Sequence, residues 1–248
     1  MFSLVHLRFA VGVLGNIISL ALFLSPVPTF LKIYKKKTVE QYSPVPYIAT
    51  IGNCALWVLY GLPDVTPGST LVISINGAGF VIQLVYLLVF ICYSDKKRRV
   101  RMVAVIMVEL VLVATLAVLV LNLVHTRKLR SRIIGIICIF GNVCMYASPL
   151  SVMRMVVSTK SVEYMPFSLS LAAFANAVCW TTYALIKFDP NIVVPNGLGM
   201  LFALAQLILY GAYYKSSKRL QLEEKNAEMN EISGGFKNVA HNNNKLPV

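Results

Sequence analysis

Long apolar runs dominate this sequence, and short polar segments separate them. The hydrocarbon core of a bilayer is about 30 Å thick and needs about 20 helical residues to cross. Each apolar run has about that length, so the pattern predicts seven membrane-spanning helices. They cover residues 9–31, 44–62, 70–93, 100–124, 132–154, 166–187 and 192–214. The first run has no strongly basic leader and no small-x-small site before Lys32, so we expect a helix of the mature protein rather than a signal peptide.

The chain changes character after the seventh run. Residues 215–248 are polar, with four glutamates and an asparagine run at 242–244. Such a segment buries too little apolar surface to offset the entropy lost on ordering. We therefore predict a solvated, disordered tail.

An internal duplication organises the seven runs. Ser25-Pro26 precedes a Lys-Thr-Val-Glu motif at 37–40, and Ser148-Pro149 precedes a Lys-Ser-Val-Glu motif at 160–163, with the same spacing in both copies. The offset of 123 residues also relates Asn53, Trp57 and Tyr60 to Asn176, Trp180 and Tyr183. The pairs Gly15-Asn16 with Gly141-Asn142, and Asn76-Gly77 with Asn196-Gly197, extend the match. Repeated motifs of this kind indicate duplicated structural units.

The duplication predicts an all-α membrane protein with a 3+1+3 arrangement. The first repeat covers residues 1–93, a linker helix covers 94–125, and the second repeat covers 126–214. Two three-helix units joined directly would be inverted in the membrane. One additional spanning helix makes them parallel, and such repeats place the substrate site near the bilayer midplane where they meet.

Composition and charge agree with a membrane protein. The chain is 57% apolar and 13% charged, against about 25% charged residues in soluble domains. The net charge of +13 arises in the loops between the apolar runs, which argues against nucleic-acid binding. One side of the membrane would carry 14 lysines and arginines and the other six, so we expect the N-terminus outside and the C-terminus in the cytosol. The basic segment 125–132 runs against this rule.

Two matched residue types predict the substrate site. Asn76 and Asn196 lie at equivalent places in their spans, and an amide offers one acceptor oxygen and two N–H donors, which suits a ligand covered with hydroxyl groups. Trp57 and Trp180 are the only tryptophans, and an indole can stack on the apolar face of a sugar ring. Together they predict a pocket for a neutral polyol. The alternatives are hydrogen bonds between helices for the amides and interfacial anchoring for the tryptophans.

Other matched positions predict auxiliary roles. Asn53 and Asn176, one turn from the tryptophans, either join the pocket or hold helices together. Prolines disrupt a helix and permit bending, so those at matched positions are candidate hinges for alternating access, with ordinary kinks as the alternative. The hinge candidates are Pro26, Pro46, Pro149 and Pro166, with Pro44 in addition.

Tyr183 is expected to reach Asp189 as an outer latch, with Tyr60 as its equivalent, unless both tyrosines are interfacial anchors.

Glu109 is the one ionisable residue clearly inside a span, in the linker helix. An intramembrane carboxylate could relay protons and make the protein a proton-coupled symporter; a locally satisfied or protonated side chain is the alternative. The spans contain no phosphate-binding glycine loop, paired carboxylates or metal-ligand cluster, and the five cysteines form no C-x-x-C pair. We therefore expect no enzyme, no catalytic residues, no cofactor and no metal. A seven-helix receptor does not explain the repeat.

Four segments closely resemble plant SWEET sugar transporters. They are M-Y-A-S-P-L-S-V-M-R at 145–154, K-S-V-E-Y-M-P-F at 160–167, I-N-G at 75–77 and P-N-G at 195–197, and the resemblance covers about residues 8–214. It implies a uniporter that moves mono- or disaccharides down their gradient by alternating access, as a homo- or hetero-oligomer. The expected location is the plasma membrane, with the vacuolar membrane as the alternative.

The resemblance also assigns roles to residues. It implies that Asn76 and Asn196 bind the sugar with Trp180 beside them, and that the four hinge candidates form the family's proline set. Tyr60, Gly61 and Tyr183 match positions near the outer gate, where Ala184 departs from a common glycine. Trp57 replaces a smaller residue, which favours the hexose-type branch over a preference for sucrose.

Overall fold

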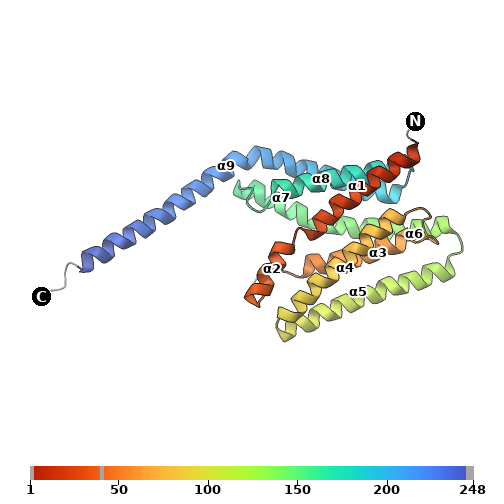
Figure 1. Ribbon diagram of the computed structural model, residues 1–248, viewed down its shortest axis with the longest axis horizontal. Coiled ribbons are helices and arrows are strands. Elements are labelled where there is room, and N and C mark those ends of the chain that lie inside the picture. Colours follow the sequence, from red (N-terminus) through yellow and green to blue (C-terminus); the bar gives the residue numbers. More distant parts are fainter. Residues whose placement is uncertain (1–2, 40–41, 244–248) are drawn as a thin grey trace.

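The computed structural model describes residues 3–39 and 42–243, so Glu40 of the first repeated motif lies outside the described residues. Nine helices make up this part of the chain, and their labels appear in Figure 1. They are α1 (Leu4–Leu24), α2 (Val27–Lys36), α3 (Val45–Gly61), α4 (Thr70–Tyr93), α5 (Lys96–Leu123), α6 (Arg127–Met145), α7 (Ala147–Thr159), α8 (Phe167–Ile186) and α9 (Pro190–Asn243).

Seven spans arise from these nine helices. In the described residues six helical segments are long and apolar enough to cross a membrane: α1 with α2, α4, α5, α6 with α7, α8 and α9. The seventh is α3, which is apolar but shorter, at 17 residues. The predicted seven-helix fold is confirmed.

The bends in the first and fifth spans occur at the matched prolines. A proline ring clashes with the carbonyl four residues earlier and has no N–H to donate to it. Consistent with this, α1 ends at Leu24, directly before Ser25-Pro26, and α6 ends at Met145, four residues before Pro149. Pro46 lies in the first turn of α3, and Pro166 directly precedes α8. All four candidate hinges therefore lie at or near a helix boundary.

The helix contacts repeat in pairs. In the first repeat α1 packs on α4, and α3 packs on α4; in the second α6 packs on α9, and α8 packs on α9. Across the repeats α1 packs on α8 as α6 packs on α3. Helix α5 has no equivalent and lies against α3, with smaller contacts to α4 and α6. This is the predicted 3+1+3 arrangement.

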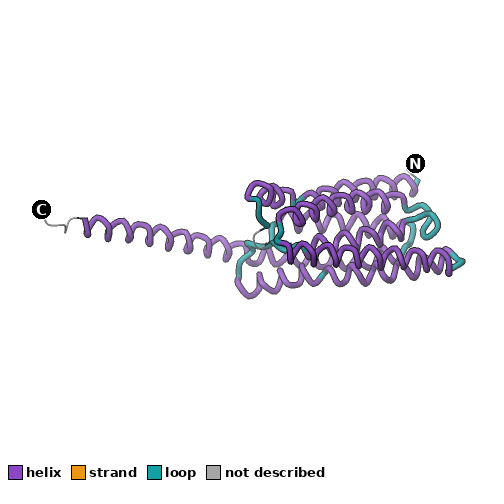
Figure 2. Tube along the Cα trace, turned by 90° about the horizontal axis from the view of Figure 1, so that it is seen from below, coloured by secondary structure: helices purple, strands orange, loops and turns teal. Residues whose placement is uncertain are grey.

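The bundle has two ends, which we name by what they carry. The N-terminal face carries the start of α1 and the connections 62–69, 124–126 and 187–189. The tail face carries residues 37–39 and 42–44 and the connections 94–95 and 160–166, and α9 leaves the bundle there (Figures 1 and 2).

Among the described residues, the buried cluster that both repeats share lies near the N-terminal face. The largest cluster of buried side chains contains Tyr60 and Val72 of the first repeat together with Tyr183 and Ile192 of the second. Toward the tail face the clusters separate. One, around Phe30 and Phe90, comprises first-repeat and linker residues, and a small one around Val156, Val162 and Met165 belongs to the second repeat.

The segment predicted to be a disordered tail continues α9 as a helix to Asn243. Figures 1 and 2 both show it extending away from the bundle. Leu, Glu, Lys and Ala are good helix formers, and no proline interrupts residues 215–243. Lys218, Arg219 and Glu223 near the start of this segment are exposed. The expectation of disorder rested on composition alone and left out this local helix propensity.

Candidate substrate site

A cavity of about 160 Å³ lies between the two repeats. All six residues predicted to contact a substrate line it, and so do residues that the sequence pattern did not single out. The lining residues are Ser19, Phe23, Asn53, Trp57, Val72, Ile75, Asn76, Asn142, Asn176, Trp180, Ile192 and Asn196. Polar groups therefore come from α1, α3 and α4 of one repeat and from α6, α8 and α9 of the other.

Asn76 and Asn196 have the same local hydrogen bond. Asn76 Nδ2 donates to the carbonyl of Val72 at 2.9 Å, and Asn196 Nδ2 donates to the carbonyl of Ile192 at 2.9 Å. Each bond fixes the side chain against its own helix, one turn back. It leaves the amide oxygen and the second N–H of each asparagine for a ligand.

The tryptophans also make equivalent contacts, each with the other repeat. Trp57 Nε1 donates to Asn142 Oδ1 at 3.3 Å, and Trp180 Nε1 donates to Ser19 Oγ at 3.2 Å. Ser19 and Asn142 are 123 residues apart, so they are structural counterparts. Aligning Asn16 with Asn142 was therefore incorrect; Asn16 instead donates to Ser74 Oγ at 2.9 Å.

Asn53 and Asn176 belong to the cavity wall but differ in their contacts. Asn176 Oδ1 accepts a hydrogen bond of 2.7 Å from Ser19 Oγ, so it connects α8 to α1. Asn53 Oδ1 is buried and has no hydrogen-bond partner within the described structure. An unpaired buried acceptor costs about 1–3 kcal/mol, which a ligand hydroxyl at this position would offset.

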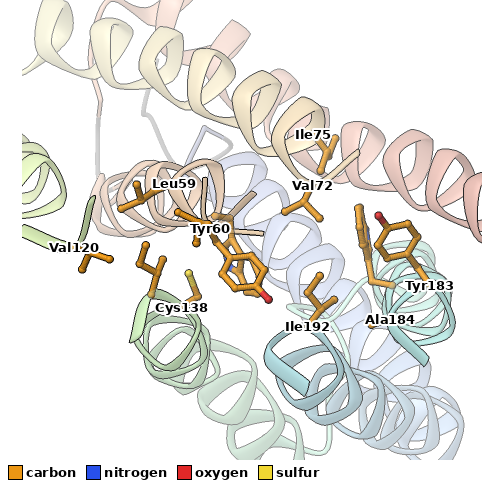
Figure 3. Close-up of a cluster of buried hydrophobic side chains, with 13 residues drawn as sticks. Leu59, Tyr60, Val72, Ile75, Val120, Cys138, Tyr183, Ala184 and Ile192 are labelled. Atoms are coloured by element: carbon orange, nitrogen blue, oxygen red, sulfur yellow. The ribbon is translucent and has the colours of Figure 1, made fainter. Parts of the chain in front are cut away.

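Toward the N-terminal face, apolar side chains close the cavity. Val72 and Ile192, which occupy equivalent positions on α4 and α9, line it, and Tyr60 and Tyr183 lie to either side of them (Figure 3). The two tyrosine side chains are 0% and 2% exposed. Each packs edge-on against the tryptophan three residues earlier, with ring centroids 5.3 Å apart in both repeats.

The latch at this face differs from the predicted one. Asp189 Oδ1 and Oδ2 accept hydrogen bonds from Tyr60 Oη at 2.8 and 2.7 Å, whereas Tyr183 lies beneath Arg8, whose Cζ is 3.9 Å from the ring centroid. Proximity in sequence suggested Tyr183 as the partner. The structure instead joins opposite repeats, because α3 packs on α6 and brings Tyr60 to the start of α9.

Toward the tail face, a second cavity of about 210 Å³ adjoins the first. The two share Asn176 and Asn196, and the second continues past Pro149, Gly199 and Gln206. These residues lie closer to the tail face along α7 and α9. The substrate cavity therefore continues toward the tail face and ends at the apolar closure on the N-terminal side.

Glu109 lies outside this pathway. It lines a lateral, mainly apolar cavity between α3, α5 and α6 and packs against Gly52. Its Oε2 is buried without a hydrogen-bond partner within the described structure. Asn53 is the one predicted substrate residue that this cavity shares with the central one, and Glu109 itself does not line the central cavity.

Two parallel helix repeats around a polar cavity define a multi-pass membrane transporter. A family model described as "Sugar efflux transporter for intercellular exchange" matches residues 9–98 and 132–218, one segment for each repeat. This chain belongs to that family, the SWEET sugar transporters, and is not an enzyme.

Individual relatives agree with the family assignment. The chain is 60% identical to the bidirectional sugar transporter SWEET7 of Arabidopsis thaliana over 221 residues, which cover 89% of this chain and 86% of that protein. It is 55% identical to the bidirectional sugar transporter SWEET4 of Oryza sativa subsp. indica over 227 residues, which cover 92% and 88%. A eukaryotic SWEET transporter structure at 3.7 Å resolution superposes with a TM-score of 0.81 at 38% identity, covering 84% of this chain and 97% of that one.

Proposed function

We propose that this protein is a facilitative uniporter that moves hexoses in both directions across the plasma membrane. The observation that carries the proposal is the cavity between the repeats, lined by Asn76 and Asn196 and by Trp57 and Trp180. The amides can donate to and accept from sugar hydroxyls, and the indoles offer flat apolar surfaces. The relatives' description as bidirectional sugar transporters supports the same direction-independent activity.

A hexose suits this cavity better than a disaccharide. The part of the cavity that the two tryptophans line has a volume of about 160 Å³. A disaccharide would have to place its second ring in the adjoining cavity of about 210 Å³, which neither tryptophan lines. The Trp57 side chain, which comes from the first repeat, narrows the cavity where a smaller residue would leave space. Its indole N–H donates to Asn142. A preference for sucrose is the alternative within the same family.

The way the core is divided supports alternating access. The repeats share a packed core near the N-terminal face and have separate clusters toward the tail face. Such an arrangement corresponds to a state in which sugar enters and leaves from the tail face. Movement about the bends at Pro26, Pro46, Pro149 and Pro166 would open the opposite face and close this one.

Orientation and assembly complete the proposal. The positive-inside rule assigns the tail face to the cytosol and the N-terminal face to the outside. The lipid-facing surfaces carry many exposed apolar side chains, as on Val105, Leu112 and Ile208, which suits a membrane-embedded homo- or hetero-oligomer. No observation favours the proton-coupled alternative, because Glu109 does not line the substrate cavity.

The site assignment is tested by replacing Asn76 or Asn196 with Ala. Losing a hydrogen-bonding partner costs about 1–3 kcal/mol, so we expect radiolabelled glucose uptake in transport-deficient cells to fall roughly tenfold or more. Asn122→Ala is a matched control, because Asn122 makes the same bond to the carbonyl one turn back, at 2.8 Å, but lies on α5 outside the cavity. Normal uptake by both cavity variants at normal surface expression would overturn the assignment.

A further inference from the structure

A separate cavity, of about 400 Å³, lies at the N-terminal face outside the latch. Four basic side chains line it: Arg8 from α1, Lys128 and Arg132 from α6, and Lys187 from the connection between α8 and α9. Asp189 is the one carboxylate among its lining residues. Both repeats contribute to it.

The positive charge of this cavity is not neutralised within the described structure. Asp189 already accepts from Tyr60 and from the backbone N–H of Asn191 at 3.1 Å. No described residue forms an ion pair or hydrogen bond with the side chains of Lys128, Arg132 or Lys187. Arg8 is held in place, because its Nε donates to the carbonyl of Tyr183 at 3.3 Å.

Three helices begin at this cavity with their N-terminal ends toward it. Ser69 directly precedes α4, α6 begins at Arg127, and α9 begins at Pro190. No side chain caps the first turn of α4 or α6. A helix N-terminus carries a partial positive charge and free N–H groups, and so attracts anions.

Hydrogen-bond donors complete the lining. Ser69 provides a hydroxyl group, and Asn191 provides an amide that keeps one N–H after its bond to Tyr60. The hydroxyls of Thr66 and Ser131 also line the cavity, but they already donate to Ser131 and Tyr60. An oxyanion with several oxygens can accept from guanidinium, ammonium and hydroxyl groups at once, and such charge-assisted bonds are the stronger kind. A neutral sugar would use only the hydroxyl and amide groups.

These four cations lie on the side of the membrane where few lysines and arginines are expected. The positive-inside rule disfavours lysine and arginine on the outer side. The basic segment 125–132 is an exception to this rule in the sequence. The structure gathers two cations of that segment, with Arg8 and Lys187, around one cavity rather than dispersing them.

We propose that this cavity is a binding site for a multivalent oxyanion of the phosphate class. Four cations that converge when the N-terminal face is closed repel one another, which favours opening. A bound dianion removes that repulsion and connects α1, α6 and the α8–α9 connection. Phosphate on this side therefore stabilises the closed face and slows sugar exchange through it.

Thermal unfolding of the purified full-length protein in detergent tests the binding directly. We expect sodium phosphate to raise the Tm by about 3 °C or more relative to sodium chloride at equal ionic strength. The double variant Lys128→Gln with Arg132→Gln should lose this difference. Arg127→Gln should keep it, since Arg127 is exposed on the same helix but does not line the cavity.

A second arm separates a free anion from a lipid headgroup. The same variants are compared in phosphatidylcholine nanodiscs with and without phosphatidylglycerol. Stabilisation by phosphate in detergent identifies a soluble ion, and stabilisation by phosphatidylglycerol alone identifies a headgroup phosphate, provided that the double variant abolishes it. Equal effects of phosphate and chloride with no effect of phosphatidylglycerol, or effects that persist in the double variant, would overturn the proposal. Because no sugar is present, the outcome is independent of the transported substrate.

Discussion

The hydroxyl of Tyr60 in the first repeat bonds both carboxylate oxygens of Asp189, which lies at the start of α9 in the second. Asn191 Nδ2 and Ser131 Oγ also donate to this hydroxyl, at 3.2 and 3.4 Å. Asp189 in turn accepts the backbone N–H of Asn191, so one carboxylate both caps α9 and holds α3. The closed N-terminal face is thus fixed by a polar contact between the repeats.

Removing this hydroxyl should weaken the closure. Tyr60→Phe removes the donor that reaches Asp189 from the other repeat, at a cost of about 1–3 kcal/mol, and shifts the population toward an open N-terminal face. We expect faster labelling of a cysteine placed at Val72, which is 2% exposed, by an impermeant maleimide added from that side. Protein without the Val72→Cys change gives the background from native cysteines.

Tyr183→Phe is the matched control for this experiment. The Tyr183 hydroxyl makes no hydrogen bond within the described structure, and the ring under Arg8 is preserved. Its labelling rate should match that of the parent protein. Equal acceleration by both substitutions would show that the Tyr60–Asp189 bond has no special role.

The glycines after Asn76 should differ sharply in their tolerance of alanine. A Cβ on Gly79 would lie 2.7 Å from ring carbons of Phe23 and 2.9 Å from Cys54 Sγ, whereas one on Gly77 would have no atom within 4 Å. Overpacking of this kind costs about 1–3 kcal/mol. We expect Gly79→Ala to lower the Tm of the purified protein by several degrees, and Gly77→Ala to leave it within about a degree. The reverse order would be incompatible with the described packing of α1 on α4.

The lysines that directly follow α2 and α7 show a second matched feature. Lys37 and Lys160 have φ of 57° and 54°, and they donate to the hydroxyls of Tyr93 at 3.2 Å and Tyr213 at 3.3 Å. A left-handed conformation costs a non-glycine residue about 1–3 kcal/mol, and an exposed cation–π contact such as that of Lys37 with Tyr34 contributes about 0.5–1 kcal/mol.

Glycine and alanine at position 37 should therefore have opposite effects. Lys37→Gly relieves the backbone and should keep or raise the Tm, whereas Lys37→Ala keeps the unfavourable φ, loses the tyrosine contacts and should lower the Tm. Thermal unfolding of the two purified variants compares them directly. A lower Tm for Gly than for Ala would show that the backbone conformation is not the dominant cost.

Asp95 should make stability depend on pH. Its carboxylate accepts the backbone N–H of Arg98 at 2.8 Å at the start of α5, and this bond lowers the pKa of Asp95 below its ordinary value. A carboxyl with a lower pKa in the folded state stabilises the fold above its unfolded-state pKa of about 3.9, and this contribution disappears as the pH falls through the folded-state pKa. The Tm of Asp95→Asn should therefore depend less on pH over this acidic range. An unchanged slope would exclude the linkage.

The sequence predicted most of the site because the duplication relates residues that lie far apart in the chain. Asn76 with Asn196 and Trp57 with Trp180 could be paired since both copies keep the same residue type, and their shared cavity follows from the symmetry of the repeats. Ser19 and Asn142 were missed as partners of the tryptophans because the two copies carry different residues there.

Contacts that cross between repeats could not be predicted in the same way. The partner of Asp189 depends on which helix of the first repeat packs near α9, and local sequence does not contain that information. Arg8 and Arg132 likewise come together only through packing of the repeats. The continuation of α9 through residues 215–243 was not predicted, because composition indicates how little apolar surface this segment can bury and does not include its local helix propensity.

Flux into proteoliposomes of the purified protein tests the proposed hexose uniport most directly. Radiolabelled glucose, fructose and sucrose are compared with and without a proton gradient, in the parent protein and in Asn76→Ala. We predict that glucose and fructose equilibrate faster than sucrose, to the same internal level whatever the proton gradient, and that Asn76→Ala slows them roughly tenfold or more. Preferential sucrose flux, accumulation above the external concentration in a proton gradient, or full hexose flux in Asn76→Ala would contradict it.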